Sequence, residues 1–143
     1  MASRHESRER ALQMLFLWDQ TRQLPEKVVA GFWGGLLSEA PGEDVPPRLP
    51  PDEFANHLLF GTVSRAEEAD KLIQAHAEHW RLERMSAVDR NILRLAVFEL
   101  LEDQTPAPVV IDEALEIARR FSGEESVQFI NGVLDAVHKA LKE

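Results

Sequence analysis

Hydrophobic residues recur every three to four positions along most of the chain, and prolines and glycines interrupt this pattern. Such spacing is typical of helices that bury one face. The pattern predicts helices over residues 4–22, 26–38, 52–84 (one long helix or two joined ones), 88–101, 111–121 and 125–142. Only residues 109–111 show even a short period of two, so the sequence predicts an all-α fold with six or seven helices.

Two features of the pattern indicate how these helices are organised. Residues 88–101 are apolar on nearly all sides, which is typical of a helix buried between other helices. Residues 41–51 contain five prolines and cannot form regular structure. We therefore expect a single domain over residues 1–143, in which an N-terminal bundle of about 1–40 and a C-terminal bundle of about 52–143 share one core.

The charge of the chain restricts the ways in which it can bind nucleic acid. The 143 residues carry 16 Lys and Arg against 25 Asp and Glu, and this net charge of −9 argues against coating of nucleic acid by bulk charge. Residues 1–10 nevertheless contain three Arg against two Glu, whereas residues 95–143 contain four Lys or Arg against ten Asp or Glu. A nucleic-acid site must therefore be local, and the acidic surplus is suited to a basic protein partner.

Several classes of protein are disfavoured by what the sequence lacks. The absence of cysteine excludes disulfides, thiol nucleophiles and thiolate metal sites. No run of eighteen apolar residues and no signal-peptide pattern occurs, so we expect a cytoplasmic protein without a membrane span. P-loop and G-x-S-x-G motifs are missing too. A zinc enzyme using His57, His76 and His79 stays an alternative, but this spacing is unspecific, and we expect no catalytic residue, metal or cofactor.

Two aromatic residues are candidates for stacking on RNA bases. One face of the first predicted helix, within an arc of about 120°, carries Arg4, His5, Arg8, Leu12 and Phe16. Guanidinium groups beside an aromatic ring are typical of surfaces that bind single-stranded RNA. Phe129 lies at the edge of the apolar stripe of the last predicted helix. The alternative interpretation of both aromatic residues is a core position in an ordinary amphipathic helix.

Four segments of the chain resemble the NusB family of bacterial transcription antitermination factors. The segments are 8–18, with Ala11-Leu12-Gln13, then 89–100, 108–114 and 129–134, the last reading Phe-Ile-Asn-Gly-Val-Leu. The resemblance implies two three-helix subdomains and a non-catalytic adaptor. Such an adaptor binds the boxA element of nascent ribosomal RNA together with the ribosomal protein NusE. It helps the elongating RNA polymerase complex to pass termination signals, and it supports maturation of ribosomal RNA.

The resemblance also implies roles for individual residues. The positions expected to bind RNA are Arg4, His5, Arg8, Gln13, Phe16, Arg94 and Phe129, and those expected to bind NusE are Asp89 and Glu125. The chain departs from many relatives in having Glu6 among its first arginines, and from several in having Phe16 in place of Tyr. We therefore expect weak RNA binding by the chain alone and stronger binding with NusE.

The sequence is compatible with more than one molecular context. The same fold occurs as the N-terminal domain of ribosomal RNA cytosine methyltransferases, which would need a catalytic domain after Glu143 and catalytic cysteines. A helical protein-interaction module without an RNA role would also show this pattern of helices. Either a monomer or a homodimer fits the sequence.

Overall fold

The computed structural model describes residues 3–38, 52–77 and 80–142, and their secondary structure is entirely helical. The described elements are α1 (Arg4–Thr21), α2 (Pro25–Ser38), α3 (Glu53–Ser64), α4 (Ala66–His76), the 3-10 helix η1 (Leu82–Arg84), α5 (Ala87–Glu102), α6 (Ala107–Phe121) and α7 (Glu124–Lys142). The predicted all-α fold is confirmed, and residues 109–111 belong to the first turn of α6. None of the described helices is long and apolar enough to cross a membrane.

Local polar contacts explain where several helices begin. Ser3 and Glu6 form a capping box at the start of α1. The Asp52 carboxylate accepts a hydrogen bond from the Ala55 N–H at 3.0 Å at the start of α3. The Ser86 hydroxyl accepts one from the Asp89 N–H at 3.1 Å at the start of α5. The segment predicted as one helix or two, 52–84, contains α3 and α4 with Arg65 between them, followed by η1.

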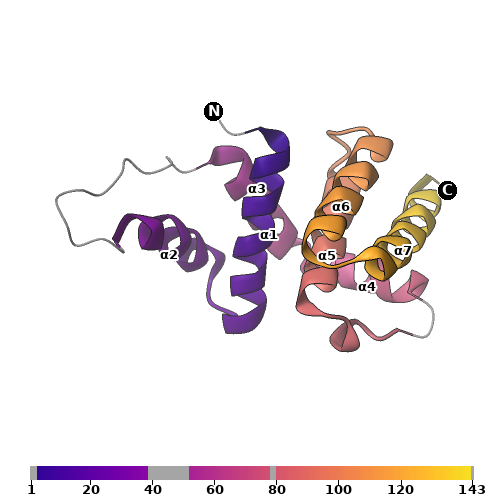
Figure 1. The fold of residues 1–143 in the computed structure, drawn as a ribbon, viewed down its shortest axis with the longest axis horizontal. Coiled ribbons are helices and arrows are strands. Elements are labelled where there is room, and N and C mark those ends of the chain that lie inside the picture. Colours follow the sequence, from indigo (N-terminus) through magenta and orange to yellow (C-terminus); the bar gives the residue numbers. More distant parts are fainter. Residues whose placement is uncertain (1–2, 39–51, 78–79, 143) are drawn as a thin grey trace.

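The helices enclose two clusters of buried side chains, and α5 contributes to both. Leu95 and Phe98 of α5 pack with residues of α1, α2 and α3. Other residues of α5, among them Leu93 and Val97, pack with α4, α6 and α7. Figure 1 shows α2, α1 and α3 toward one end of the molecule and α6 and α7 toward the other end. This arrangement explains why residues 88–101 are apolar nearly all round.

The two clusters divide the helices differently from the bundles expected from the sequence. The sequence places α3 in the C-terminal bundle, because α3 follows the proline-rich segment 41–51. The structure instead packs Ala55, Leu58 and Leu59 of α3 with α1 and α2. The change from one cluster to the other therefore occurs near Arg65, between α3 and α4, while the segment 39–51 lies outside the described residues.

Candidate nucleic-acid interface

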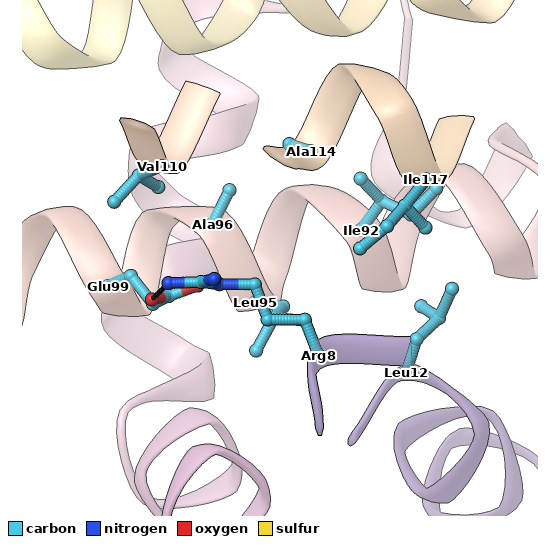
Figure 2. A pocket seen from close by; sticks show the side chains of 9 residues that line it. All are labelled: Arg8, Leu12, Ile92, Leu95, Ala96, Glu99, Val110, Ala114 and Ile117. Carbon is cyan, nitrogen blue, oxygen red and sulfur yellow. Dashed lines mark hydrogen bonds and ion pairs between the residues drawn. The ribbon is translucent and has the colours of Figure 1, made fainter. Parts of the chain in front are cut away.

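Arg8, one of the residues expected to bind RNA, is buried in the structure. Its side chain reaches from α1 to α5, where the guanidinium donates two hydrogen bonds of 2.9 Å to the Glu99 carboxylate. Figure 2 shows this pair among apolar side chains such as Val110, and Arg8 is only 4% exposed. Burial opposes the charge of Arg8, but the hydrogen bonds with Glu99 and the negative charges of Glu99 and Glu113 together outweigh it and raise the pKa of the guanidinium. Arg8 therefore joins two helices and does not face solvent.

Arg94 is likewise held inside the protein. Its guanidinium binds the Asp70 carboxylate at 2.7 and 3.0 Å and Asp19 at 3.0 Å, and the residue is 3% exposed. Arg90 also binds Asp19, at 2.5 Å. Burial opposes ionisation of Asp19, but hydrogen bonds from Arg90 and Arg94 outweigh burial and lower the pKa of this carboxyl. The cluster links α1, α4 and α5 and encloses the Arg94 guanidinium.

Arg4 and His5 lie at the accessible end of α1. The Arg4 guanidinium lies 3.7 Å from the centre of the Phe54 ring, an arrangement in which the cation stays exposed. His5 makes a 2.5 Å contact with Glu113 of α6. The hydrogen bond with Glu113 raises the pKa of the His5 ring, although partial burial opposes this change. A raised pKa favours the cationic imidazolium, which lies within ion-pair distance of both Glu113 and Glu9.

Gln13 and Phe16 lie on the exposed side of α1, beside a depression that we call the apolar groove. The groove has a volume of about 370 Å³ and is lined by Leu12, Gln13, Phe16, Leu17, Val88 and Phe121. Phe16 is 41% exposed, so its ring is only partly covered by the chain itself. Since Leu12 is buried, the predicted face of α1 contains both core and surface positions.

Phe129, Asp89 and Glu125 meet in a second depression, which we call the aromatic hollow. It has a volume of about 210 Å³ and is lined by Trp80, Arg84, Met85, Ser86, Asp89, Glu125, Ser126 and Phe129. The Asp89 carboxylate accepts hydrogen bonds from Ser122 at 2.7 Å and from Ser126 at 2.8 Å. The first turn of α5 contributes to both depressions, since Asp89 lines the hollow and Val88 lines the apolar groove.

The structure therefore separates the nine expected site residues into two sets. Seven lie at accessible or partly accessible positions, and they are Arg4, His5, Gln13, Phe16, Asp89, Glu125 and Phe129. Arg8 and Arg94 are internal, and their guanidinium groups are paired with the carboxylates of Glu99, Asp19 and Asp70. The apolar spacing also predicts Trp80 on a helical stripe, whereas this residue follows the end of α4 and is 54% exposed.

Two of the three histidines considered as a zinc site have other partners. The His57 ring contacts the Glu102 carboxylate, and the His76 Nδ1 lies 2.9 Å from the Leu72 carbonyl oxygen. His79 lies outside the described residues. Within the part of the chain that the structure describes, no group of three or more His, Cys, Asp or Glu side chains could hold a metal ion.

Comparison with known proteins identifies the family. A model described as the NusB family matches residues 5–139, which is nearly the whole chain. The chain belongs to the NusB family. It is 54% identical over 143 residues to the transcription antitermination protein NusB of Solibacter usitatus, covering all of this chain and 93% of that protein. It is 41% identical to the NusB of Geobacillus kaustophilus over 141 residues, covering 98% of each chain.

Solved structures of this family share the fold. The structure of T. maritima NusB superposes with a TM-score of 0.78 at 34% identity, covering 96% of this chain and 92% of that one. A structure of the antitermination factors NusB and NusE in complex with double-stranded RNA gives a TM-score of 0.77 at 27% identity, covering 96% of each chain. That relative therefore assembles with both NusE and RNA.

Proposed function

We propose that this NusB-family chain is a transcription antitermination factor, an adaptor that binds boxA RNA of nascent ribosomal transcripts together with NusE. The match to the NusB family over residues 5–139 is the main support for this proposal. The solved relative bound to NusE and double-stranded RNA supports the choice of partners. The adaptor joins the elongating RNA polymerase complex in the cytoplasm, where it promotes processive transcription and maturation of ribosomal RNA.

The RNA-binding surface runs from the start of α1 to the aromatic hollow. Arg4 and the imidazolium of His5 contact phosphates, Gln13 donates to or accepts from the RNA, and Phe16 and Phe129 stack on bases. Each stack contributes roughly 1–3 kcal/mol. Arg8 and Arg94 support this surface indirectly, because their ion pairs with Glu99 and Asp70 fix α1 and α4 against α5.

The NusE-binding surface includes Asp89 and Glu125. Glu125 is exposed and Asp89 is partly exposed, at the beginning of α7 and α5 respectively. Two carboxylates in a chain of net charge −9 attract a basic protein and accelerate its association. Since both residues line the same hollow as Phe129, the two partners meet there, and binding of one increases the effective concentration of the other.

Fluorescence anisotropy with a labelled boxA RNA, with and without saturating NusE, tests this function. We expect NusE to increase the RNA affinity at every salt concentration, with an RNA of the same length and shuffled sequence as the control. An equal affinity with and without NusE would contradict the joint surface. Binding of NusE but of no RNA would instead favour a protein-interaction module.

Family membership also favours an adaptor over a zinc enzyme or a methyltransferase domain. The relatives that match over nearly their whole length are antitermination proteins, and residues 5–139 of this chain account for the match to the family model. The oligomeric state is a separate property of the adaptor. Analytical ultracentrifugation at several protein concentrations distinguishes a monomer from a homodimer.

A further inference from the structure

We propose that the aromatic hollow binds a single unpaired nucleobase, with Trp80 and Arg84 as RNA-contacting residues beside Phe129. The inference rests on the proposed RNA-binding function and extends it to a defined pocket and two further residues. The hollow lies between the segment 80–86, the first turn of α5 and the start of α7.

Two aromatic rings give the hollow a surface on which a base can stack. The centres of the Trp80 and Phe129 rings are 6.0 Å apart, and the ring planes are inclined at 61°, so the rings meet edge to face. Trp80 is 54% exposed, whereas the other two tryptophans, Trp18 and Trp33, are 8% and 4% exposed. An exposed indole is costly in water unless a partner covers it, and a planar base covers one face without displacing Phe129.

The size of the hollow favours a small planar ligand. Its volume of about 210 Å³ lies below the roughly 300–1,000 Å³ of pockets that hold drug-sized ligands. One flat heterocycle stacked on the indole, beside the phenyl ring, suits this space better than a longer chain. The apolar groove, with Phe16 in its lining, is a separate depression, and its residue Val88 is the neighbour in sequence of Asp89 in the hollow.

Arg84 supplies a positive charge at the hollow, and its guanidinium forms no ion pair with another described residue. Of the arginines in the described part of the chain, only Arg4 and Arg84 form no ion pair with another described residue. The neighbouring Arg81, by contrast, is paired with Glu83 at 3.7 Å. An unpaired guanidinium next to an aromatic pair can bind the phosphate of the nucleotide whose base is stacked.

The acidic side chains of the hollow determine which part of the nucleotide enters. Asp89 is held by the hydroxyls of Ser122 and Ser126, and Glu125 forms no ion pair or side-chain hydrogen bond with another described residue. Carboxylates repel a phosphate but accept hydrogen bonds from amino groups on bases. We therefore expect an uncharged base in the hollow, its phosphate at Arg84, and a preference for bases that carry an exocyclic amino group.

Anisotropy titrations of labelled single-stranded boxA RNA, with NusE present, test the hollow. Trp80→Ala should weaken RNA binding about tenfold, whereas Trp80→Phe, which keeps a stacking ring, should retain most of the affinity. Arg84→Gln should weaken binding and reduce its dependence on salt, and Arg81→Gln should change neither. Phe60→Ala, which removes an exposed aromatic side chain of α3, is the control for loss of aromatic surface.

A second measurement on the unsubstituted chain does not depend on folding of any variant. Acrylamide should quench mainly Trp80, because Trp18 and Trp33 are buried, and saturating boxA RNA should protect Trp80 from the quencher. Absence of this protection, or wild-type RNA affinity in Trp80→Ala, would overturn base binding in the hollow but not the proposed function. If Trp80→Ala and Arg84→Gln lose NusE affinity without losing RNA affinity, the hollow belongs to the protein partner and base binding there is overturned too. Failure of the unsubstituted chain to bind RNA, even with NusE, would overturn the proposed function as well.

Discussion

At the scale of single residues, Gly61 lies in close contact with a neighbouring helix, unlike the other glycines whose surroundings the structure describes. A Cβ atom added to this glycine of α3 would overlap the ring carbons of Phe98 in α5. Gly61→Ala should therefore lower the free energy of unfolding by about 1–3 kcal/mol, the usual effect of overpacking a core. Urea denaturation followed by circular dichroism measures this loss.

Gly31 provides a matched control for that substitution. It also lies inside a helix, but no described atom lies within 4 Å of an added Cβ. Gly31→Ala should stabilise α2 by up to about 1 kcal/mol, since alanine is the better helix former. Equal effects of the two substitutions would contradict close contact between Gly61 and Phe98.

Thr62 carries a polar atom that has no hydrogen-bond partner among the described residues. Its hydroxyl is buried and forms no hydrogen bond with them. Thr62→Val replaces this hydroxyl by a methyl group of similar size, so it should leave stability unchanged or increase it by about 1 kcal/mol. Thr62→Ser keeps the hydroxyl and removes the methyl, and it should be destabilising in the same denaturation experiment. A loss of stability in Thr62→Val would indicate a hydrogen bond to water at this site.

At the scale of the helices, a buried ion pair joins α1 to α5. Arg8→Met leaves the Glu99 carboxylate buried without its partner, and it should cost about 3–5 kcal/mol of stability. The double substitution Arg8→Met with Glu99→Leu should recover most of this loss. Arg10→Met, which breaks a more exposed pair with Asp52, should cost less than half as much. Chemical denaturation of the four proteins provides the comparison.

The same variants separate a structural role of Arg8 from a role in RNA contact. Because the guanidinium is enclosed, the folded double variant should bind boxA RNA with nearly wild-type affinity. A large loss of RNA affinity in a stable double variant would mean that Arg8 leaves Glu99 to reach a phosphate.

The contact between α1 and α6 should depend on pH through His5. The hydrogen bond with Glu113 raises the pKa of His5 above its usual 6.5 in the folded chain. The stabilisation is therefore complete below about pH 6.5 and is lost as the pH rises through the folded-state pKa. It should stay below about 1 kcal/mol, because the His5 side chain is more than a third exposed. Thermal unfolding between pH 5.5 and 8 measures it.

Two variants test whether this dependence arises from the pair. His5→Gln and Glu113→Gln should each flatten the change in melting temperature over this pH range. A dependence that persists in both variants would assign it to other groups. Glu9 and Glu116 also face His5 and also favour its charged form, so a small residual effect in Glu113→Gln is expected.

The helices are encoded locally, whereas the roles of several side chains are not. Helix positions follow from local spacing and capping, and the predicted elements lie close to those observed. The role of Arg8 depends on Glu99, which is 91 positions away, and no local pattern encodes that pairing. Similarly, Trp80 continues the apolar spacing of α4, but the helix ends at His76 and the ring becomes exposed. The sequence thus predicts which face of a helix is buried better than it predicts which arginines form no ion pair.

At the scale of the whole molecule, the net charge of −9 and the internal ion pairs both weaken RNA binding. Most described arginines are neutralised within the protein, which leaves Arg4 and Arg84, among those described, available to phosphates without breaking an ion pair. An acidic chain with so few free guanidinium groups should bind RNA weakly alone. A basic partner that binds the acidic surface would reduce the repulsion of phosphate and add contacts of its own.

The small number of free arginines predicts how RNA binding depends on salt. Each phosphate contact with single-stranded nucleic acid contributes about 0.7 to the slope of log affinity against log salt concentration, so the two free arginines together contribute about −1.4 for the chain alone. Arg84→Gln should make the slope less steep by about 0.7, and addition of NusE should make it steeper. Anisotropy titrations over a fourfold range of potassium chloride concentration measure these slopes. A slope of about −4 or steeper for the chain alone would mean that the internal pairs of Arg8, Arg10 or Arg94 open when RNA binds.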